Sequence, residues 1–142
     1  MSGAPAVLAY LAEVTIAGPA LSAQTRNRQR LEQWRHSVAA AARSQNPGTA
    51  PAGDDVEVWI SEFSEYPTRD RDNLAKPILD ALQGVLYLND RQVKRLSVEW
   101  CDLNGSYIVR YMSPVVAAAL STGAEFLWVR IQAFEPRRGL TR

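Results

Sequence analysis

The chain of 142 residues has one cysteine, one histidine and almost no net charge, and each shortage excludes a class of protein. Cys101 alone cannot close an internal disulfide, and a zinc site needs a cluster of Cys or His that is missing here. With only His36, a histidine-based catalytic triad is remote, and Cys101 has no neighbouring base to activate it. The balance of 16 Lys+Arg against 15 Asp+Glu does not indicate a basic protein that coats nucleic acid or a membrane surface.

Long apolar runs and sorting signals are also missing. Residues 1–16 are apolar but lack a basic start and contain Glu13, so we do not expect a signal peptide. No stretch approaches the roughly 20 apolar residues of a membrane span. No glycine-rich phosphate loop appears, so no nucleotide cofactor is expected. These absences together predict a cytoplasmic protein without membrane contacts.

The composition that remains is that of one globular domain over residues 1–142, with 46% hydrophobic residues. Prolines and glycines predict an exposed loop over 45–54, and residues 135–142 are expected to form a flexible basic tail. Alternation of apolar and polar residues predicts strands over the following ranges: 7–16, 56–61, 93–103, 106–112 and 127–131. The predicted strands 93–103 and 106–112 flank Asn104-Gly105, a dipeptide that favours a tight hairpin turn.

Apolar residues at spacings of three and four predict helices over 24–43 and 74–83, and Ser113-Pro114 indicates the start of a short third helix. Pro77 is comfortable only in a first helical turn, so the helix around it should start late or be distorted. Gly84 fits the left-handed position just past its end. We therefore predict an α/β (α+β) fold, a mixed sheet of about five strands with two main helices against it.

The chemistry-bearing segment precedes and enters the second predicted helix. Asp70 and Asp72 are two residues apart, and in an extended segment their carboxylates point the same way and repel unless a cation lies between them. Hard oxygen ligands of this kind suit Mg²⁺ or Mn²⁺. Lys76 follows about one helical turn later and could stabilise phosphoryl charge. Asp90, in a turn before a strand, offers a further acid.

The same residues also fit an interpretation without chemistry. Asp-x-Asp-Asn before a helix is typical of N-capping, and Asp90 is an ordinary turn residue. Lys76 and Asp80 have the spacing of a surface ion pair. A further acidic group is expected to solvate a loop and a strand face: Asp54, Asp55 and Glu57. Spacing alone leaves both interpretations open.

Several motifs in one order carry a resemblance to a known family. Gly18-Pro19 and Ser22 precede an Arg-rich helix with Trp34, residues 69–84 read RDRDNLAKPILDALQG, and residues 87–93 read YLNDRQV. Over roughly residues 14–100 the chain resembles the RusA-type Holliday junction resolvases of bacteria and their prophages. The resemblance implies a cytoplasmic, Mg²⁺-dependent (Mn²⁺ possible) endodeoxyribonuclease. Such an enzyme resolves four-way DNA junctions by paired cuts in recombination and repair, and acts as a homodimer.

The resemblance also assigns roles to individual residues. It implies catalytic roles for Asp70, Asp72, Lys76 and Asp90, with the three aspartates as ligands of Mg²⁺. We expect DNA phosphate contacts from Arg26, Arg28, Arg30, Arg35, Arg69 and Arg71, and supporting roles for Asn73, Asp80 and Asn89. One departure is Asn89, which stands where the family often has an acid. Two alternatives remain: a non-catalytic module that binds DNA junctions, and a structural or interaction domain.

The charge along the chain gives the small net charge a different meaning. Residues 54–72 contain seven acids and two bases, whereas residues 26–43 contain five arginines and one acid, and three more arginines follow position 136. The balance is therefore a sum of opposed patches. It is compatible with an acidic site that binds a metal and is flanked by basic phosphate contacts.

Overall fold

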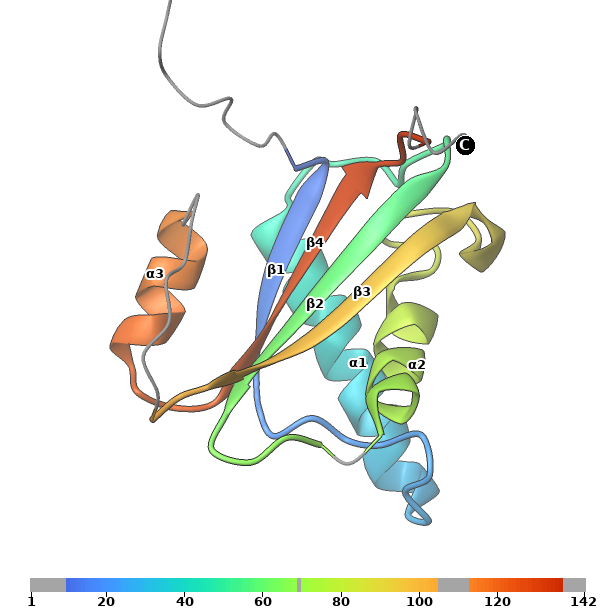
Figure 1. The fold of residues 1–142 in the computed structure, drawn as a ribbon. Helices are drawn as coiled ribbons and strands as arrows, with labels where there is room; N and C mark the ends of the chain where they lie inside the picture. Colours follow the sequence, from blue (N-terminus) through green and yellow to red (C-terminus); the bar gives the residue numbers. More distant parts are fainter. Residues whose placement is uncertain (1–9, 69, 105–112, 137–142) are drawn as a thin grey trace, which may run out of the picture.

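The structure, a computed structural model, describes residues 10–68, 70–104 and 113–136. These residues form a mixed α+β domain, as predicted (Figure 1). The elements in chain order are β1 (Ala12–Ala17), α1 (Arg28–Gln45), β2 (Val56–Ser64), α2 (Arg71–Leu82), the 3-10 helix η1 (Asp90–Gln92), β3 (Val93–Asp102), α3 (Pro114–Ser121) and β4 (Phe126–Ala133). Arg69, the predicted strand 106–112, residues 7–9 of the first predicted strand and the end of the basic tail lie outside the described residues.

Within the residues that the structure describes, the sheet has four strands in the order β1-β4-β2-β3. β4 pairs antiparallel with both β1 and β2, whereas β2 and β3 run parallel. A parallel pair needs a crossover connection, and α2 lies in the connection between β2 and β3. β2 therefore lies inside the sheet, and β1 and β3 form its two edges.

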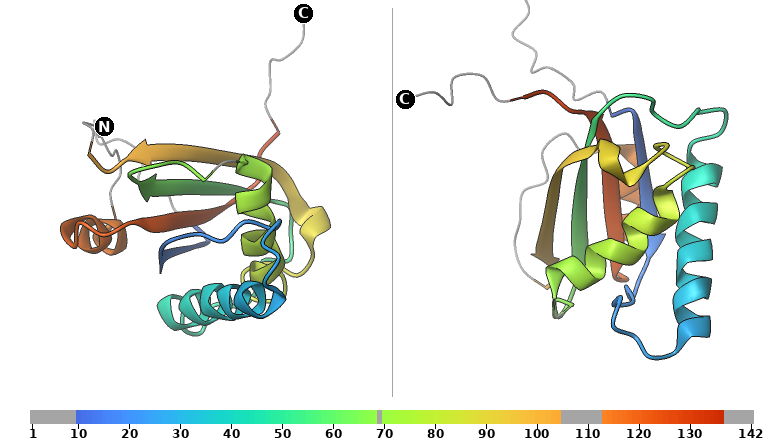
Figure 2. Two further views of the ribbon diagram at one scale, coloured as in Figure 1. Left: turned by 90° about the horizontal axis from the view of Figure 1, so that it is seen from below. Right: turned by 90° about the vertical axis from the view of Figure 1, so that its right-hand side faces the viewer.

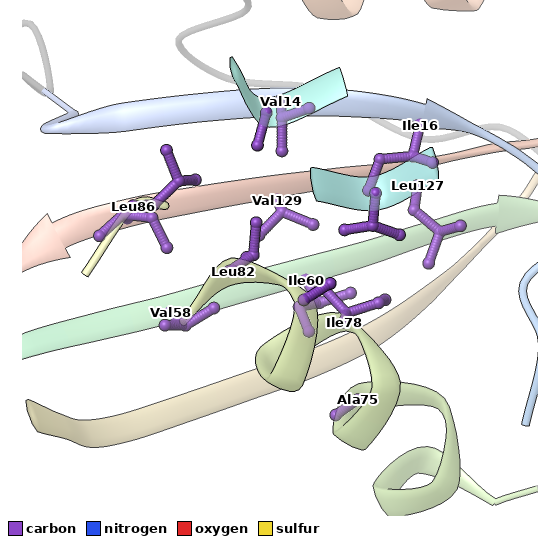
Figure 3. Close-up of a cluster of buried hydrophobic side chains, with 14 of the residues drawn as sticks. Val14, Ile16, Val58, Ile60, Ala75, Ile78, Leu82, Leu86, Leu127 and Val129 are labelled. Atoms are coloured by element: carbon purple, nitrogen blue, oxygen red, sulfur yellow. The ribbon is translucent and has the colours of Figure 1, made fainter. Parts of the chain in front are cut away.

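The main core lies between the sheet and the two long helices, which cover the same face (Figure 2). Alternate residues of the strands, such as Val58 and Ile60 of β2, point toward Ile78 and Leu82 of α2 (Figure 3). α1 contributes a stripe of buried side chains: Leu31, Trp34, Val38 and Ala42. α3 contributes Val116 to a smaller cluster of different strand residues: Phe63, Phe126 and Trp128.

Local signals fix most element ends. α1 begins at Arg28 because the Asn27 side chain accepts a hydrogen bond from the Arg30 amide at 3.1 Å. Gly84, with φ 82°, follows α2 as predicted, and Ser113 caps α3. The range 45–54, predicted as a loop, falls between α1 and β2, except that residue 45 still belongs to α1. In the described part of the chain, none of the helices is long and apolar enough to cross a membrane.

The predicted late start of α2 is wrong, because the helix begins at Arg71 and continues through Pro77. Proline has no N–H, so the carbonyl of Asn73, four residues earlier, loses its usual helical partner. The Ala23 amide, from the loop between β1 and α1, donates to this carbonyl at 2.8 Å. The Ala23 amide thus replaces the hydrogen-bond donor that the Asn73 carbonyl lacks, and this bond anchors the loop against α2.

Candidate active site

Asp70 and Asp72 lie at the N-terminus of α2, and not in one extended segment as predicted. Asp70 is the N-cap residue with extended backbone (φ −116°, ψ 118°), whereas Asp72 belongs to the first helical turn. The Asp70 side chain makes no capping hydrogen bond, and its Oδ2 accepts from the Asn73 side chain at 3.1 Å. Both aspartates are exposed. N-capping therefore does not occupy the Asp70 carboxylate, and the unpaired N–H groups of the first turn favour negative charge here.

Glu62 holds the chain on both sides of Asp70. This residue of β2 is only 4% exposed, and its carboxylate accepts from the Thr68 amide at 3.1 Å and the Thr68 hydroxyl at 2.6 Å. It also accepts from Arg71 Nη2 at 2.7 Å, and Arg71 donates in turn to the Thr68 carbonyl at 2.6 Å. Sequence reasoning missed Glu62, although an acid inside a strand with buried neighbours is a signal for such a contact. Arg71 thus bonds to Glu62 and Thr68 within the chain. Its predicted contact with DNA stays a prediction.

Lys76 lies on the exposed face of α2, between Asp72 and Asp80. The three residues are spaced by four, which places them on the same side of the helix. Lys76 Nζ lies 3.9 Å from Asp80 Oδ2, and Arg35 of α1 reaches the same oxygen at 3.7 Å. The Lys76 side chain is 68% exposed, so this pair restrains it only weakly and leaves the ammonium group accessible.

Three of the predicted phosphate-binding arginines line one hollow of about 500 Å³ beside the start of α1: Arg26, Arg28 and Arg35. The same hollow is lined by Ala23, whose amide is bonded to Asn73 of α2. The arginines and the N-terminal half of α2 are thus held in one region of the surface. Arg30 is exposed in the first turn of α1 and does not line this hollow.

Asp90 lies at the C-terminal end of α2, whereas Asp70 and Asp72 lie at its N-terminal end. Figure 1 shows that the segment between α2 and β3 follows the end of α2 nearer the start of β3. The Asp90 amide donates to the side chain of Gln83, the residue that follows α2, at 3.1 Å. A helix of 12 residues such as α2 spans about 18 Å. Accordingly, the described residues contain no group of three Asp, Glu, His or Cys side chains able to hold a metal ion. The structure therefore brings Asp70 and Asp72 together but not Asp90 of the same copy.

The turn that carries Asp90 is held by side chains. Asn89 Oδ1 accepts from the Arg91 amide at 2.9 Å, and the Gln92 side chain accepts from the Asn89 amide at 2.7 Å. Asn89 thus caps η1. Burial, followed by the negative charges of Asp80 and Asp90, raises the pKa of Tyr87 well above its usual range. The Tyr87 hydroxyl donates to the Leu79 carbonyl at 2.7 Å.

Two side chains outside this region clarify the sequence expectations. Burial raises the pKa of the Cys101 thiol to about 11, which agrees with the expectation that it is not a nucleophile. The expectation that Glu57 solvates a strand face is wrong, because Glu57 is 8% exposed and accepts from Trp59 Nε1 at 3.0 Å and Arg95 at 3.3 Å. Asp54 and Asp55 are exposed, as predicted.

A family model described as endodeoxyribonuclease RusA matches residues 17–110. The match begins at the last residue of β1 and includes α1, β2, α2, η1 and β3, and therefore every residue to which we assign a site role. It ends before α3 and β4. Among curated proteins, no match is found.

Proposed function

Because the chain belongs to the RusA family of endodeoxyribonucleases, we propose that it resolves four-way DNA junctions by metal-dependent phosphodiester hydrolysis, in recombination and repair. The observation that carries this proposal is the N-terminus of α2. Two exposed carboxylates, those of Asp70 and Asp72, lie there without a capping role, and Lys76 follows one turn later. Because the Asp70 carboxylate makes no capping hydrogen bond, it remains available as a ligand beside Asp72.

The donor set fits a hard divalent cation. Mg²⁺ is usually bound by one or two carboxylates, together with waters and phosphate oxygens, and Asp70 and Asp72 supply such a pair. When bound here, Mg²⁺ or Mn²⁺ polarises the phosphoryl group and favours attack by water. Asn73 orients the Asp70 carboxylate, and Glu62 fixes the chain around it. Lys76 stabilises the negative charge that develops on the phosphoryl oxygens.

Asp90 enters the proposal through a second copy of the chain. Within one copy it is separated from Asp70 and Asp72 by the length of α2, so it cannot share a small cation with them. A two-fold homodimer would offer the partner's Asp90 to the site, and would place two equivalent sites on a junction that has nearly the same symmetry. We propose that each site combines Asp70 and Asp72 of one copy with Asp90 of the other.

The arginine-lined hollow supplies the proposed phosphate contacts. Arg26, Arg28 and Arg35 border it, and the bond from Ala23 to Asn73 keeps it beside the α2 carboxylates. Arginines that neutralise phosphates release counterions, so junction affinity should fall steeply as salt is raised. Substituting one of these arginines should reduce the slope of that salt dependence by about one.

The test is cleavage of a synthetic four-way junction with Mg²⁺ by the wild type and by Asp72→Asn. We expect the rate to fall at least about a hundredfold, because the variant loses the charge of one metal ligand. Glu135→Gln is the matched control, since it removes an exposed acid that follows β4 and has no role in the proposed site. An Asp72→Asn protein that cuts at the wild-type rate would show that the site is assigned wrongly.

Other DNA substrates, a binding assay and a melting assay distinguish junction resolution from the alternative functions. Flap and linear duplex substrates test whether the four-way junction is the preferred DNA. A wild type that binds junctions but cuts none with Mg²⁺ or Mn²⁺ would support a non-catalytic binding module. A melting temperature unchanged by Mn²⁺, with no retardation of DNA, would support a structural domain, because a ligand bound only by the native state must stabilise it.

A further inference from the structure

The Asp90 turn, defined here as residues 88–92, is bonded at every backbone amide. Gln92 Oε1 accepts from the first two amides of the turn, at 2.9 Å and 2.7 Å. The side chain of Gln83, which follows α2, accepts from the Asp90 amide at 3.1 Å. Asn89 accepts from the last two amides, one with its side chain and one with its carbonyl. The backbone on both sides of Asp90 is therefore fixed.

Gln92 also ties the Asp90 turn to a segment that is distant in sequence. Its Nε2 donates to the carbonyls of Ala52 at 2.8 Å and Asp54 at 2.7 Å, which lie between α1 and β2. The Ala52 amide donates in turn to the Leu86 carbonyl at 2.9 Å. A side-chain amide has two acceptor positions and two N–H donors, and Gln92 uses all of them on backbone groups. This side chain is thus a cross-link between two segments.

The Asp90 carboxylate takes no part in this network. Within the part of the chain that the structure describes, it accepts no hydrogen bond and forms no ion pair, and Asp90 is exposed. Asn89 caps η1, a role that an aspartate side chain can also take. The turn therefore combines a fixed backbone with a carboxylate that is free to bind a ligand.

We propose that Gln92 is a positioning residue for Asp90, because it ties the Asp90 turn to the segment between α1 and β2. The inference rests on the proposed function, in which Asp90 is a metal ligand in the site of a second copy. A ligand carried on a fixed backbone loses little freedom when the metal binds. Misplacing it by about 1 Å can cost roughly a hundredfold in rate. Gln83 supports the same residue with one bond.

Gln45 offers a matched comparison. Its side chain also bonds to a distant backbone segment, accepting from the Thr15 amide at 2.9 Å and donating to the Thr15 carbonyl at 2.8 Å. These bonds join the end of α1 to β1 and do not involve the Asp90 turn. Gln45→Met and Gln92→Met therefore both remove bonds between a glutamine and the backbone, but only Gln92→Met removes support from Asp90.

Amide hydrogen exchange tests whether Gln92 holds the turn. Gln92→Met keeps an unbranched side chain of similar length and removes all four hydrogen bonds. We expect the Leu88 and Asn89 amides to exchange about tenfold faster than in the wild type, and at the wild-type rate in Gln45→Met. Exchange at these two amides that is unchanged in Gln92→Met would overturn the proposal.

Junction cleavage at increasing Mg²⁺ concentration tests whether this support serves the site. Each variant is measured where circular dichroism shows it fully folded. For Gln92→Met, we expect the Mg²⁺ concentration that gives half the maximal rate to rise about 10–100-fold, as for other residues that orient a metal ligand. Junction affinity without added metal should stay within about twofold of the wild type, and Gln45→Met should match the wild type in both. A slower rate with an unchanged Mg²⁺ requirement would contradict the positioning role.

Gln83 carries the test if Gln92→Met does not fold. Gln83 is exposed and makes one bond to the turn, so Gln83→Ala removes less. We expect Gln83→Ala to raise the Mg²⁺ requirement at least about threefold, because the Asp90 amide loses its acceptor. Gln83→Glu keeps an oxygen acceptor and should return to within about twofold of the wild type. No effect of Gln83→Ala, or no recovery in Gln83→Glu, would count against the proposal.

The wild type keeps the two proposals distinguishable. A wild type that cuts no junction with Mg²⁺ or Mn²⁺ contradicts the proposed function. Cleavage by the wild type, together with a Gln92→Met protein that has the same Mg²⁺ requirement, contradicts only the positioning role of Gln92.

Discussion

Replacing Glu62 with glutamine should destabilise the protein and loosen the chain that carries Asp70. Glu62 is 4% exposed and accepts three hydrogen bonds, two from Thr68 and one from Arg71. Glutamine keeps the shape and one carbonyl oxygen, but it loses the charge and introduces an NH2 group toward donors. The substitution therefore changes the electrostatics of this contact and leaves the packing nearly intact.

The magnitude follows from those contacts. A hydrogen bond to a charged group contributes about 1.5–3 kcal/mol. The Arg71 side chain is 31% exposed, so its guanidinium regains some water and the loss falls toward the lower end. We expect the free energy of unfolding to fall by about 2 kcal/mol, or roughly 4–8 °C in Tm for a chain of this size.

The assay is urea unfolding, because urea leaves the ionic strength unchanged, combined with the rate of junction cleavage. Glu65→Gln is the matched control, since Glu65 is an exposed acid in the same segment and should change the stability by less than about 0.5 kcal/mol. Cleavage by Glu62→Gln should fall under conditions where the variant is still fully folded. Equal stability of the two variants would refute the reasoning.

Two further predictions concern Pro77 and Cys101. Pro77→Ala restores a backbone N–H that competes with the Ala23 amide for the Asn73 carbonyl. The Ala23 amide should therefore exchange its hydrogen at least about tenfold faster than in the wild type. An unchanged exchange rate would show that Pro77 does not anchor the loop. With the pKa of Cys101 at about 11, roughly one thiol in a thousand is ionised at pH 8, and alkylation by iodoacetamide should rise about tenfold per pH unit until near pH 11. A plateau near pH 9 would contradict the burial of this thiol.

The sequence predicted the elements whose signals are local. Alternation in β2 and the apolar stripe of α1 both follow from the faces that must be buried, and these elements lie close to their predicted ranges. The start of α2 was predicted too late because the rule for Pro77 takes no account of a donor from Ala23, far away in sequence. Glu62 was missed, and Glu57 was predicted as exposed, because Thr68, Arg71 and Arg95, which donate to these buried acids, come from other segments.

The site could be predicted only in part for the same reason. The motif placed Asp70, Asp72 and Lys76 on one stretch of chain, and in the structure they lie at the N-cap and in the N-terminal half of α2. The motif also grouped Asp90 with them, although α2 separates it from the pair within one copy. Linear spacing does not encode whether residues meet within a copy or across a dimer.

The central claim, that each site combines acids from two copies, can be tested most directly by mixing subunits. Asp72→Asn and Asp90→Asn subunits with different affinity tags are co-expressed, and the mixed dimers are isolated through both tags. In such a dimer, one site carries both substitutions and the other carries neither. We predict that each variant alone is inactive and that the mixed dimer nicks one strand of the junction. A mixed dimer as inactive as its parents would contradict the account, because Asp72 and Asp90 would then act within the same copy.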